Sequence, residues 1–367
     1  MKSKKIRILL LSNWDMCIYN MRLEMITKLL NLGHEVVISS LYGSRIEDLK
    51  ALGCSYVKTE FDNRGMNIKD DLKLIRHYRK VMRDVKPDVV LTYMIKPNIY
   101  GGIAATKEKI PFIANITGLG TSLQNKGLVQ TAIVMLYRMA FKKVSFVFFQ
   151  NEANLKFFKE KKIGYTSGKL LPGSGVNLSN FTPLPFPESE SQISFVFIAR
   201  VTKAKGIDHY LEAAKVITDK YKHTKFYICG NCEPMYEKTL NKYQEAGIIT
   251  YLGVVKDVKK ILEVVHCTVL PSYHEGLSNV LLESAASARP AITTNVNGCK
   301  EVVEDEVTGI LVEPKNTESL IVGIEKFLCL SHEEKEKLGE RGRAKVEKEF
   351  NREIVVDAYL EAIADVT

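Results

Sequence analysis

The sequence contains no uninterrupted long apolar run and no low-complexity stretch rich in Pro, Gly or Ser. Its longest apolar segment, residues 128–149, is broken by Arg138, Lys142 and Lys143, unlike a transmembrane helix. The basic residues near the start lead only into a short strand, without a small-residue cleavage site, so we expect no secretory signal. With 46% hydrophobic and 26% charged residues, the composition is that of a globular protein.

Two further absences narrow the function classes. The seven cysteines are odd in number and scattered, which favours reduced thiols in a cytoplasmic protein over a disulfide framework. Residues 12–20, after the first expected strand, contain no glycine. A Gly-x-Gly-x-x-Gly fingerprint is therefore missing, which argues against a dehydrogenase or a sugar-nucleotide epimerase.

Charge is distributed unevenly along the chain. Residues 1–180 carry 29 Lys and Arg against 14 Asp and Glu, a net charge of +15, whereas residues 181–367 carry 23 against 29, a net charge of −6. The basic half suggests an anionic partner such as a membrane surface, although a basic solvated surface would have the same composition. A nucleic-acid-binding protein is the alternative, but no recognised nucleic-acid module is present, so we expect no nucleic-acid partner.

Short β-branched and aliphatic runs alternate with helical patterns, as in a parallel, doubly wound sheet. Strands are expected at 6–11, 36–40, 87–92, 111–115 and 144–149, and again at 193–198, 225–229, 250–252, 267–270, 291–294 and 309–312. The intervening residues 172–187 have the composition of a linker. The sequence therefore predicts two Rossmann-like α/β domains, 1–180 and 181–350, and a last helix within 351–367 that could return to the first domain.

Two segments of the second half carry charges at expected strand ends. Arg200 and Lys205 precede Gly206 and a helix, which supplies two cations and free backbone N–H groups for a diphosphate; an ordinary basic loop has the same composition. Glu275 lies in the loop after another strand, and Glu283 lies in the helix that follows. A carboxylate in that apolar helix needs a partner, and the vicinal hydroxyls of a ribose would serve.

These residues carry a resemblance. Residues 271–290, Pro-Ser-Tyr-His-Glu-Gly-Leu-Ser-Asn-Val-Leu-Leu-Glu-Ser-Ala-Ala-Ser-Ala-Arg-Pro, resemble the Glu-x7-Glu signature of family 4 glycosyltransferases. Its companions are the Arg200 and Lys205-Gly206 pair, Leu252-Gly-Val-Val-Lys-Asp257, and Gly298-Cys-Lys-Glu301 ahead of residues 305–312. The resemblance implies the GT-B architecture, in which two Rossmann-like domains face each other across a cleft, and sugar transfer with retention of configuration.

The resemblance also implies roles for the second-half residues. Glu275 would approach the donor sugar, while Arg200 and Lys205 would neutralise the departing diphosphate; these three are the catalytic candidates. The remaining donor-binding candidates hold the ribose, the phosphates and the base: Glu283, Gly206, Gly253, Val254, Val255, Gly276, Leu277, Ser278 and Asn279. The donor would be a UDP- or GDP-sugar, with UDP the commoner case. Fixed cations can replace a metal ion, and no Asp-x-Asp sequence occurs, so we expect no metal cofactor.

The first-half loops resemble those of enzymes that add sugars to undecaprenyl-diphosphate-linked intermediates in bacterial glycan assembly. The loop at 115–122 lacks the His that many relatives place there, so that role is not transferred. The acceptor-binding candidates are Asn20, Arg22, Lys96, Asn115, Thr117 and Gly118. For Arg22 and Lys96, a contact with the acceptor diphosphate and a solvated surface charge are equally open readings.

The segment 128–143 connects the acceptor with a membrane. Five apolar residues recur at helical spacing, Leu128, Ile133, Leu136, Met139 and Ala140, and basic residues stand at one end. Such a helix lies in a membrane interface or faces a protein core. With the resemblance, this segment predicts a retaining glycosyltransferase on the inner face of the cell membrane. It would move a hexose or N-acetylhexosamine to a lipid-linked sugar in the assembly of a polysaccharide, capsule, O-antigen or glycoprotein glycan. The alternative is a glycosyltransferase with a soluble acceptor.

Overall fold

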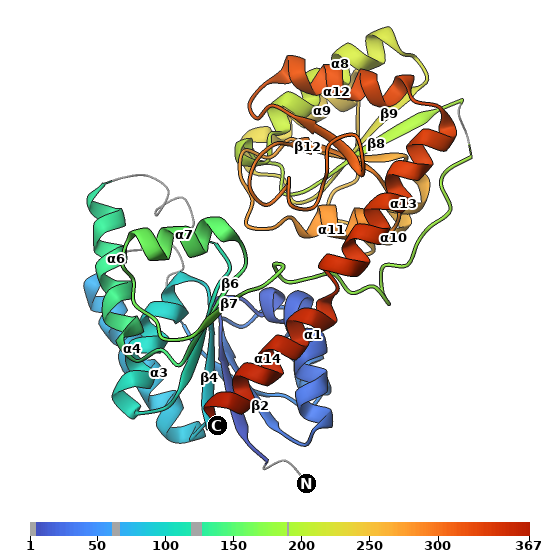
Figure 1. The fold of residues 1–367 in the computed structure, drawn as a ribbon. Helices are drawn as coiled ribbons and strands as arrows, with labels where there is room; N and C mark the ends of the chain where they lie inside the picture. The colour runs from blue at the N-terminus through green and yellow to red at the C-terminus, as the bar shows by residue number, and fades with distance from the viewer. Residues whose placement is uncertain (1–4, 61–66, 119–126, 189–190) are drawn as a thin grey trace. The chain divides into compact units, whose positions relative to one another are not determined.

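The computed structural model describes residues 5–60, 67–118, 127–188 and 191–367. The chain divides into two compact units, Met1–Ser174 with Glu353–Thr367, and Gly175–Arg352 (Figure 1). The expected boundaries at 180 and 350 are therefore shifted. Residues 175–180 have a linker composition but join the second unit, because Val176 forms a β-bridge with Asn351 and its N–H donates to the carbonyl of Phe350.

The first unit contains a parallel sheet in the order β3-β2-β1-β4-β5-β6-β7. The strands are β1 (Arg7–Leu11), β2 (Glu35–Ser40), β3 (Ser55–Lys58), β4 (Val89–Tyr93), β5 (Phe112–Ile116), β6 (Phe146–Phe149) and β7 (Gly168–Leu170). Alternate residues of β1 feed two cores, Leu9 and Leu11 on one face and Ile8 and Leu10 on the other. This alternation is the two-residue period of a strand buried on both faces.

Helices cover both faces of this sheet. One face carries α3 (Ile68–Val85), α4 (Gly102–Glu108) and α6 (Leu128–Ala140), and the other carries α1 (Asp15–Asn31) and α14 (Arg352–Val366) (Figure 1). The remaining elements are α2 (Ile46–Ala51), the π-helical turn η1 (Pro97–Gly101), the 3₁₀ turn η2 (Phe141–Lys143) and α7 (Glu152–Glu160). Helix α1 has acidic Asp15 in its first turn, where a negative charge favours a helix start.

The faces of α6 differ from those expected. The sequence grouped Leu128, Ile133, Leu136, Met139 and Ala140 as one apolar side, but the structure splits them. Ile133 and Ala140 are buried in the core, whereas Leu128 and Met139 are 90% and 49% exposed. The helix is apolar around most of its circumference, so periodicity alone could not decide which side packs on the sheet.

Arg22 is also placed differently from a surface residue. Its side chain is 1% exposed, and its guanidinium carbon lies 5.1 Å from the ring centre of Tyr93 and 5.4 Å from that of Tyr359. Tyr359 belongs to α14, so Arg22 packs the last helix against α1 and β4 of the same unit. The reading of Arg22 as a solvated charge is wrong, because cation–π contacts and burial replace water around it.

The second unit contains a parallel sheet in the order β10-β9-β8-β11-β12-β13. Its strands are β8 (Ile193–Ile198), β9 (Thr224–Cys229), β10 (Thr250–Tyr251), β11 (Cys267–Leu270), β12 (Ala291–Thr294) and β13 (Gly309–Val312). The helices and turns are η3 (Lys203–Lys205), α8 (Ile207–Lys220), η4 (Pro234–Tyr236), α9 (Glu237–Glu245), α10 (Val258–Val264), α11 (Asn279–Ala286), α12 (Thr317–Cys329) and α13 (His332–Glu349). Strand order reverses beside β8, the position where doubly wound sheets bind ligands.

Candidate active site

The loops after β8 and β11 are held together by their backbones. Gly206 has φ +76°, and a Cβ built on it would lie 2.0 Å from the carbonyl oxygen of Pro271. The N–H of Tyr273 donates to the carbonyl of Ala204 at 2.9 Å. A side chain at position 206 would be strained and would push the two loops apart. Gly206 therefore allows the loop of Lys205 to approach the loop of Glu275.

A third loop, after β12, supports Glu275 from another side. Gly298 has φ +87°, and a Cβ there would lie 2.6 Å from the Cβ of Glu275. The N–H of Glu275 donates to the carbonyl of Asn297 at 3.3 Å, and the N–H of Ser278 donates to that of Gly298 at 2.9 Å. Three loops at the carboxyl edge of one sheet thus fix the backbone of Glu275.

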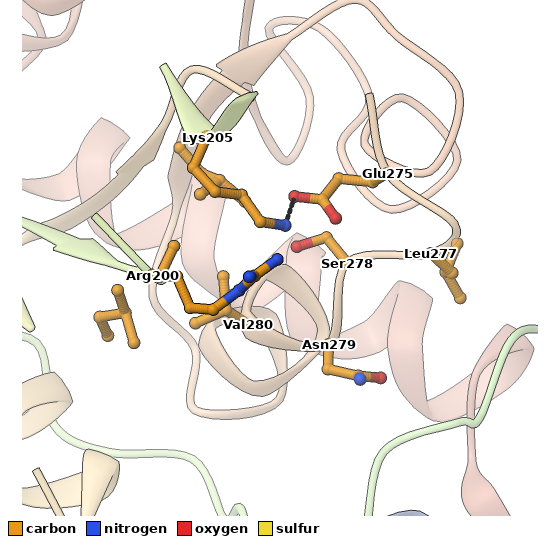
Figure 2. Close-up of a pocket in the computed structure, with 10 residues that line it drawn as sticks. Arg200, Lys205, Glu275, Leu277, Ser278, Asn279 and Val280 are labelled. Atoms are coloured by element: carbon orange, nitrogen blue, oxygen red, sulfur yellow. Dashed lines mark hydrogen bonds and ion pairs between the residues drawn. The ribbon is translucent and has the colours of Figure 1, made fainter. Parts of the chain in front are cut away.

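A cavity of about 250 Å³ lies between the β8 loop, the β11 loop and the start of α11 (Figure 2). The side chains of Arg200 and Lys205 converge in it, and Glu275 faces Lys205 across it. Its lining residues are Ile198, Ala199, Arg200, Lys205, Leu270, Glu275, Leu277, Ser278, Asn279 and Val280. The structure therefore brings together the three catalytic candidates and three of the donor-binding candidates.

Glu275 is held by two donors. Lys205 Nζ lies 2.5 Å from Glu275 Oε1, and Ser272 Oγ donates to the same oxygen at 2.7 Å. The carboxyl group is only 11% exposed and the lysine 23%, so water screens this ion pair little. Arg200 is exposed in the same cavity, at the end of β8. Two cations beside the N-terminus of α11 form a site suited to a phosphorylated ligand.

Ser272 was not selected from the sequence, although it lies three residues before Glu275 in the Glu-x7-Glu segment. Its carbonyl also accepts a hydrogen bond from Thr294 Oγ1 of β12 at 2.5 Å. The apolar lining residues Ile198, Ala199, Leu270 and Val280 were missed as well. Their positions at strand ends and in the first turn of α11 are the only sequence signals that could have indicated them.

Glu283 lies in the second turn of α11, outside the cavity lining. Burial raises the pKa of its carboxyl group to about 7, and the nearby positive charge of Arg352 opposes that rise. A carboxyl whose pKa lies near neutrality is unusual and marks a functional-site candidate. Arg352 itself donates to the carbonyl of Gly175 at 3.1 Å.

The other donor-binding candidates also lie outside the lining of this cavity: Gly206, Gly276, Gly253, Val254 and Val255. The last three follow β10, where the carbonyl of Gly253 accepts a hydrogen bond from the N–H of Gly230 at 2.8 Å. Val254 is 72% exposed. Strands β10 and β8 are parallel members of one sheet, so the loops at their carboxyl ends lie on the same side of it. The loop after β10 is therefore on the ligand-binding side of the unit.

The acceptor-binding candidates lie in the first unit, with differing environments. Asn115, at the end of β5, is 1% exposed, and neither amide atom has a hydrogen-bond partner among the described residues. Lys96 lies 3.6 Å from Asp71 and is 15% exposed, so it is not a solvated charge. Asn20 is exposed, and Thr117 and Gly118 are half-buried. Residues 119–122 of that loop lie outside the described residues.

Within residues 5–60, 67–118, 127–188 and 191–367, no group of three or more His, Cys, Asp or Glu side chains is arranged to hold a metal ion. Within the same ranges, no helix combines the length and apolar character needed to span a bilayer. Each of the seven cysteines is a free thiol.

Two family models match the chain, one in each half. Residues 184–345 match Glycosyl transferases group 1, and residues 7–151 match Glycosyl transferase 4-like. Together they cover every strand of the two sheets except β7.

Curated relatives match over much of their length. The N,N'-diacetylbacillosaminyl-diphospho-undecaprenol alpha-1,3-N-acetylgalactosaminyltransferase of Campylobacter jejuni is 27% identical, over 96% of this chain and 97% of that protein. The UDP-Gal:alpha-D-GlcNAc-diphosphoundecaprenol alpha-1,3-galactosyltransferase of Escherichia coli is 27% identical over 70% of each chain.

Solved structures show the same fold. A glycosyltransferase from Rickettsia africae superposes with a TM-score of 0.82 at 19% identity, covering 99% of each chain. Anabaena HepE, in complex with UDP and glucose, superposes with a TM-score of 0.80 at 14% identity, covering 98% of this chain and all of that one. The predicted GT-B fold class is confirmed.

Proposed function

The chain is a glycosyltransferase of the GT4 type with the GT-B fold, and from this premise we propose that it transfers a hexose or N-acetylhexosamine from a UDP-sugar to a lipid-diphosphate-linked sugar, with retention of the anomeric configuration. The observation that carries this proposal is the cavity in which Arg200, Lys205 and Glu275 meet beside the start of α11. In this proposal Arg200 and Lys205 receive the diphosphate of the donor, and Glu275 meets its sugar.

In this proposal the leaving group determines what the site must do. Breaking the anomeric bond leaves an oxocarbenium-like sugar and adds negative charge to the diphosphate, so fixed cations there stabilise the transition state more than the ground state. Arg200 and Lys205 supply these cations without a metal ion. Glu283, with Arg352 nearby, would accept hydrogen bonds from the ribose hydroxyls.

The assignment of UDP and of a lipid-linked acceptor is supported by the relatives. One of them is named as a UDP-Gal transferase acting on a diphosphoundecaprenol-linked sugar, and the other as acting on a diphospho-undecaprenol-linked sugar. In the first unit, the amide of buried Asn115 has no hydrogen-bond partner among the described residues, which supports a polar ligand at that strand end, because a buried amide without a partner costs free energy. We place the reaction at the inner face of the bacterial cell membrane, where such acceptors are extended.

The proposal can be tested in two steps. Saturation-transfer NMR with UDP- and GDP-sugars should identify a UDP-sugar that contacts the full chain. That donor should then extend a synthetic prenyl-diphosphate-linked monosaccharide to a disaccharide, detected by mass spectrometry. Contact with a GDP-sugar alone would overturn the donor assignment, and transfer only to free sugars would overturn the acceptor assignment.

A further inference from the structure

The outer side of α6 carries a row of apolar side chains. Leu128, Ala132, Met135 and Met139 follow one another at spacings of four, three and four residues, so they lie along one side of the helix. Leu128 is 90% exposed, Met135 67% and Met139 49%. Val129 adjoins the row and is also exposed. We call these five residues the outer stripe of α6.

The opposite side of α6 is already used for packing. Ile133, Val134, Tyr137 and Ala140 are buried in the core of the first unit, against η1 and α4. Single exposed apolar residues are common on protein surfaces, but a continuous row on a helix that is also apolar inside indicates an interaction surface. The outer stripe is not part of this core.

A basic cluster adjoins the end of the outer stripe. Lys142 and Lys143, in the 3₁₀ turn η2 that continues α6, are exposed. The guanidinium of Arg138 donates to the carbonyl of Lys161 at 2.5 Å from Nη2, which brings Lys161 and exposed Lys162 to the same end of the helix. The combination of apolar side chains with neighbouring lysines is typical of helices that lie in the headgroup region of anionic bilayers.

We propose that the outer stripe and this basic cluster form the surface by which the enzyme docks on an anionic lipid bilayer. The inference rests on the proposed function, because a lipid-linked acceptor stays in the membrane, and it names the surface that would meet that membrane. Helix α6 has 13 residues, about 20 Å in length, which is too short to cross the hydrocarbon core. It therefore lies along the interface, where hydrophobic contact and charge each give weak, reversible binding and act together.

The test uses the full chain and sedimentation with vesicles of phosphatidylcholine containing about one third phosphatidylglycerol. Wild type should sediment with these vesicles, less so at high salt. Met135→Glu/Met139→Glu should reduce binding at least tenfold, because it places charge in the interface. Lys142→Glu/Lys143→Glu should abolish the preference for phosphatidylglycerol. Met235→Glu is the matched control, since Met235 is 73% exposed in the second unit, and it should bind as wild type does.

Two readouts separate the docking surface from the activity. Transfer to a short, water-soluble prenyl-diphosphate acceptor should be unchanged in Met135→Glu/Met139→Glu, whereas transfer to the vesicle-bound acceptor should fall at least tenfold. Wild type and variant should have equal melting temperatures, and loss of both activities at equal melting temperatures would contradict a role in docking alone.

The proposal would be overturned if wild type stayed in the supernatant, or if Met135→Glu/Met139→Glu bound vesicles as wild type does. It would also be overturned if wild type were a dimer that these substitutions convert to a monomer without affecting vesicle binding. Failure of transfer to the soluble acceptor in wild type would instead contradict the proposed function.

Discussion

Lys205 Nζ lies 2.5 Å from Glu275 Oε1, although the two residues are 70 positions apart in the chain. The lysine follows β8 and the glutamate follows β11, so their contact depends on the pairing of these neighbouring strands. The ion pair orients the lysine at the wall of the cavity that it shares with Arg200. Lys205 is thus already held in position when a diphosphate enters the cavity, so binding does not have to order a mobile lysine side chain.

The first prediction concerns Lys205→Ala. We expect kcat/KM to fall by roughly two orders of magnitude, on the order of 2–4 kcal/mol, because the variant removes a charged donor to the leaving group and leaves a partly buried carboxylate unpaired. Lys203→Ala is the control, since Lys203 is an exposed lysine of the same 3₁₀ turn. Equal losses in both variants, or near-normal turnover in Lys205→Ala, would contradict the role of Lys205.

The second prediction concerns Glu283→Gln and stability. The folded-state pKa of about 7 lies above the usual 4.5, so the folded state holds this proton more tightly than the unfolded state between those values. This contribution to stability is present at low pH and is lost as pH rises through 7. Glu283→Gln should therefore be more stable than wild type at pH 8, by up to about 3 kcal/mol, and equal to it near pH 4, as measured by urea unfolding.

The same variant should bind the donor less well. Ribose hydroxyls donate to an ionised carboxylate better than to a neutral amide, so wild-type affinity for the UDP-sugar should rise between pH 6 and 8, whereas that of Glu283→Gln should stay flat. Isothermal titration calorimetry in buffers of different ionisation enthalpy would detect the proton released on binding to wild type. A pH-independent wild-type affinity would remove Glu283 from the donor site.

The third prediction is that transfer does not require a divalent metal. Because Arg200 and Lys205 would neutralise the diphosphate, we expect the rate in EDTA to equal that in added Mg²⁺ within about twofold. The measurement is a continuous assay of UDP release after the protein has been dialysed against chelator. Loss of activity that Mg²⁺ or Mn²⁺ restores would assign the phosphate chemistry to a metal ion instead.

The fourth prediction concerns Arg22. Arg22→Ala should lower the free energy of unfolding by about 2–5 kcal/mol, because it opens a cavity between α1, β4 and α14 and removes two cation–π contacts. Arg22→Met keeps most of the volume and should cost less than half as much. Denaturant titration of both variants checks this. If Arg22→Met retained stability but raised the KM for the acceptor more than tenfold, Arg22 would be an acceptor ligand as well.

The last prediction is stereochemical. Retention means that a UDP-α-sugar gives an α-glycoside, since the acceptor oxygen arrives on the face from which the diphosphate leaves. Arg200 and Lys205 would hold the diphosphate beside the acceptor hydroxyl, whose proton would pass to a departing phosphate oxygen, so no general base is required. The coupling constant of the anomeric proton in the product decides the outcome, and a β-linked product would refute retention. A trapped glycosyl adduct on Glu275 would show a covalent retaining route instead.

The strands and the donor-site motifs were predictable because each is local in sequence. A buried strand such as β8 is a short apolar run, and Arg200 and Lys205 follow it within seven residues. The strands β3 and β7 were missed because they lie at the two edges of the first sheet and bury little apolar surface. An edge strand lacks the apolar signal on which such predictions depend.

Alone, the sequence determined two α/β units, the order of their elements and the residues that follow the strands of the second sheet. The tertiary structure decided three things that depend on contacts between distant segments: the pairing of Lys205 with Glu275, the burial of Arg22 against Tyr359, and the side of α6 that faces the core. Local patterns encode helix and strand through side-chain periodicity, but which charges meet and which apolar side remains exposed depends on how the elements pack against one another.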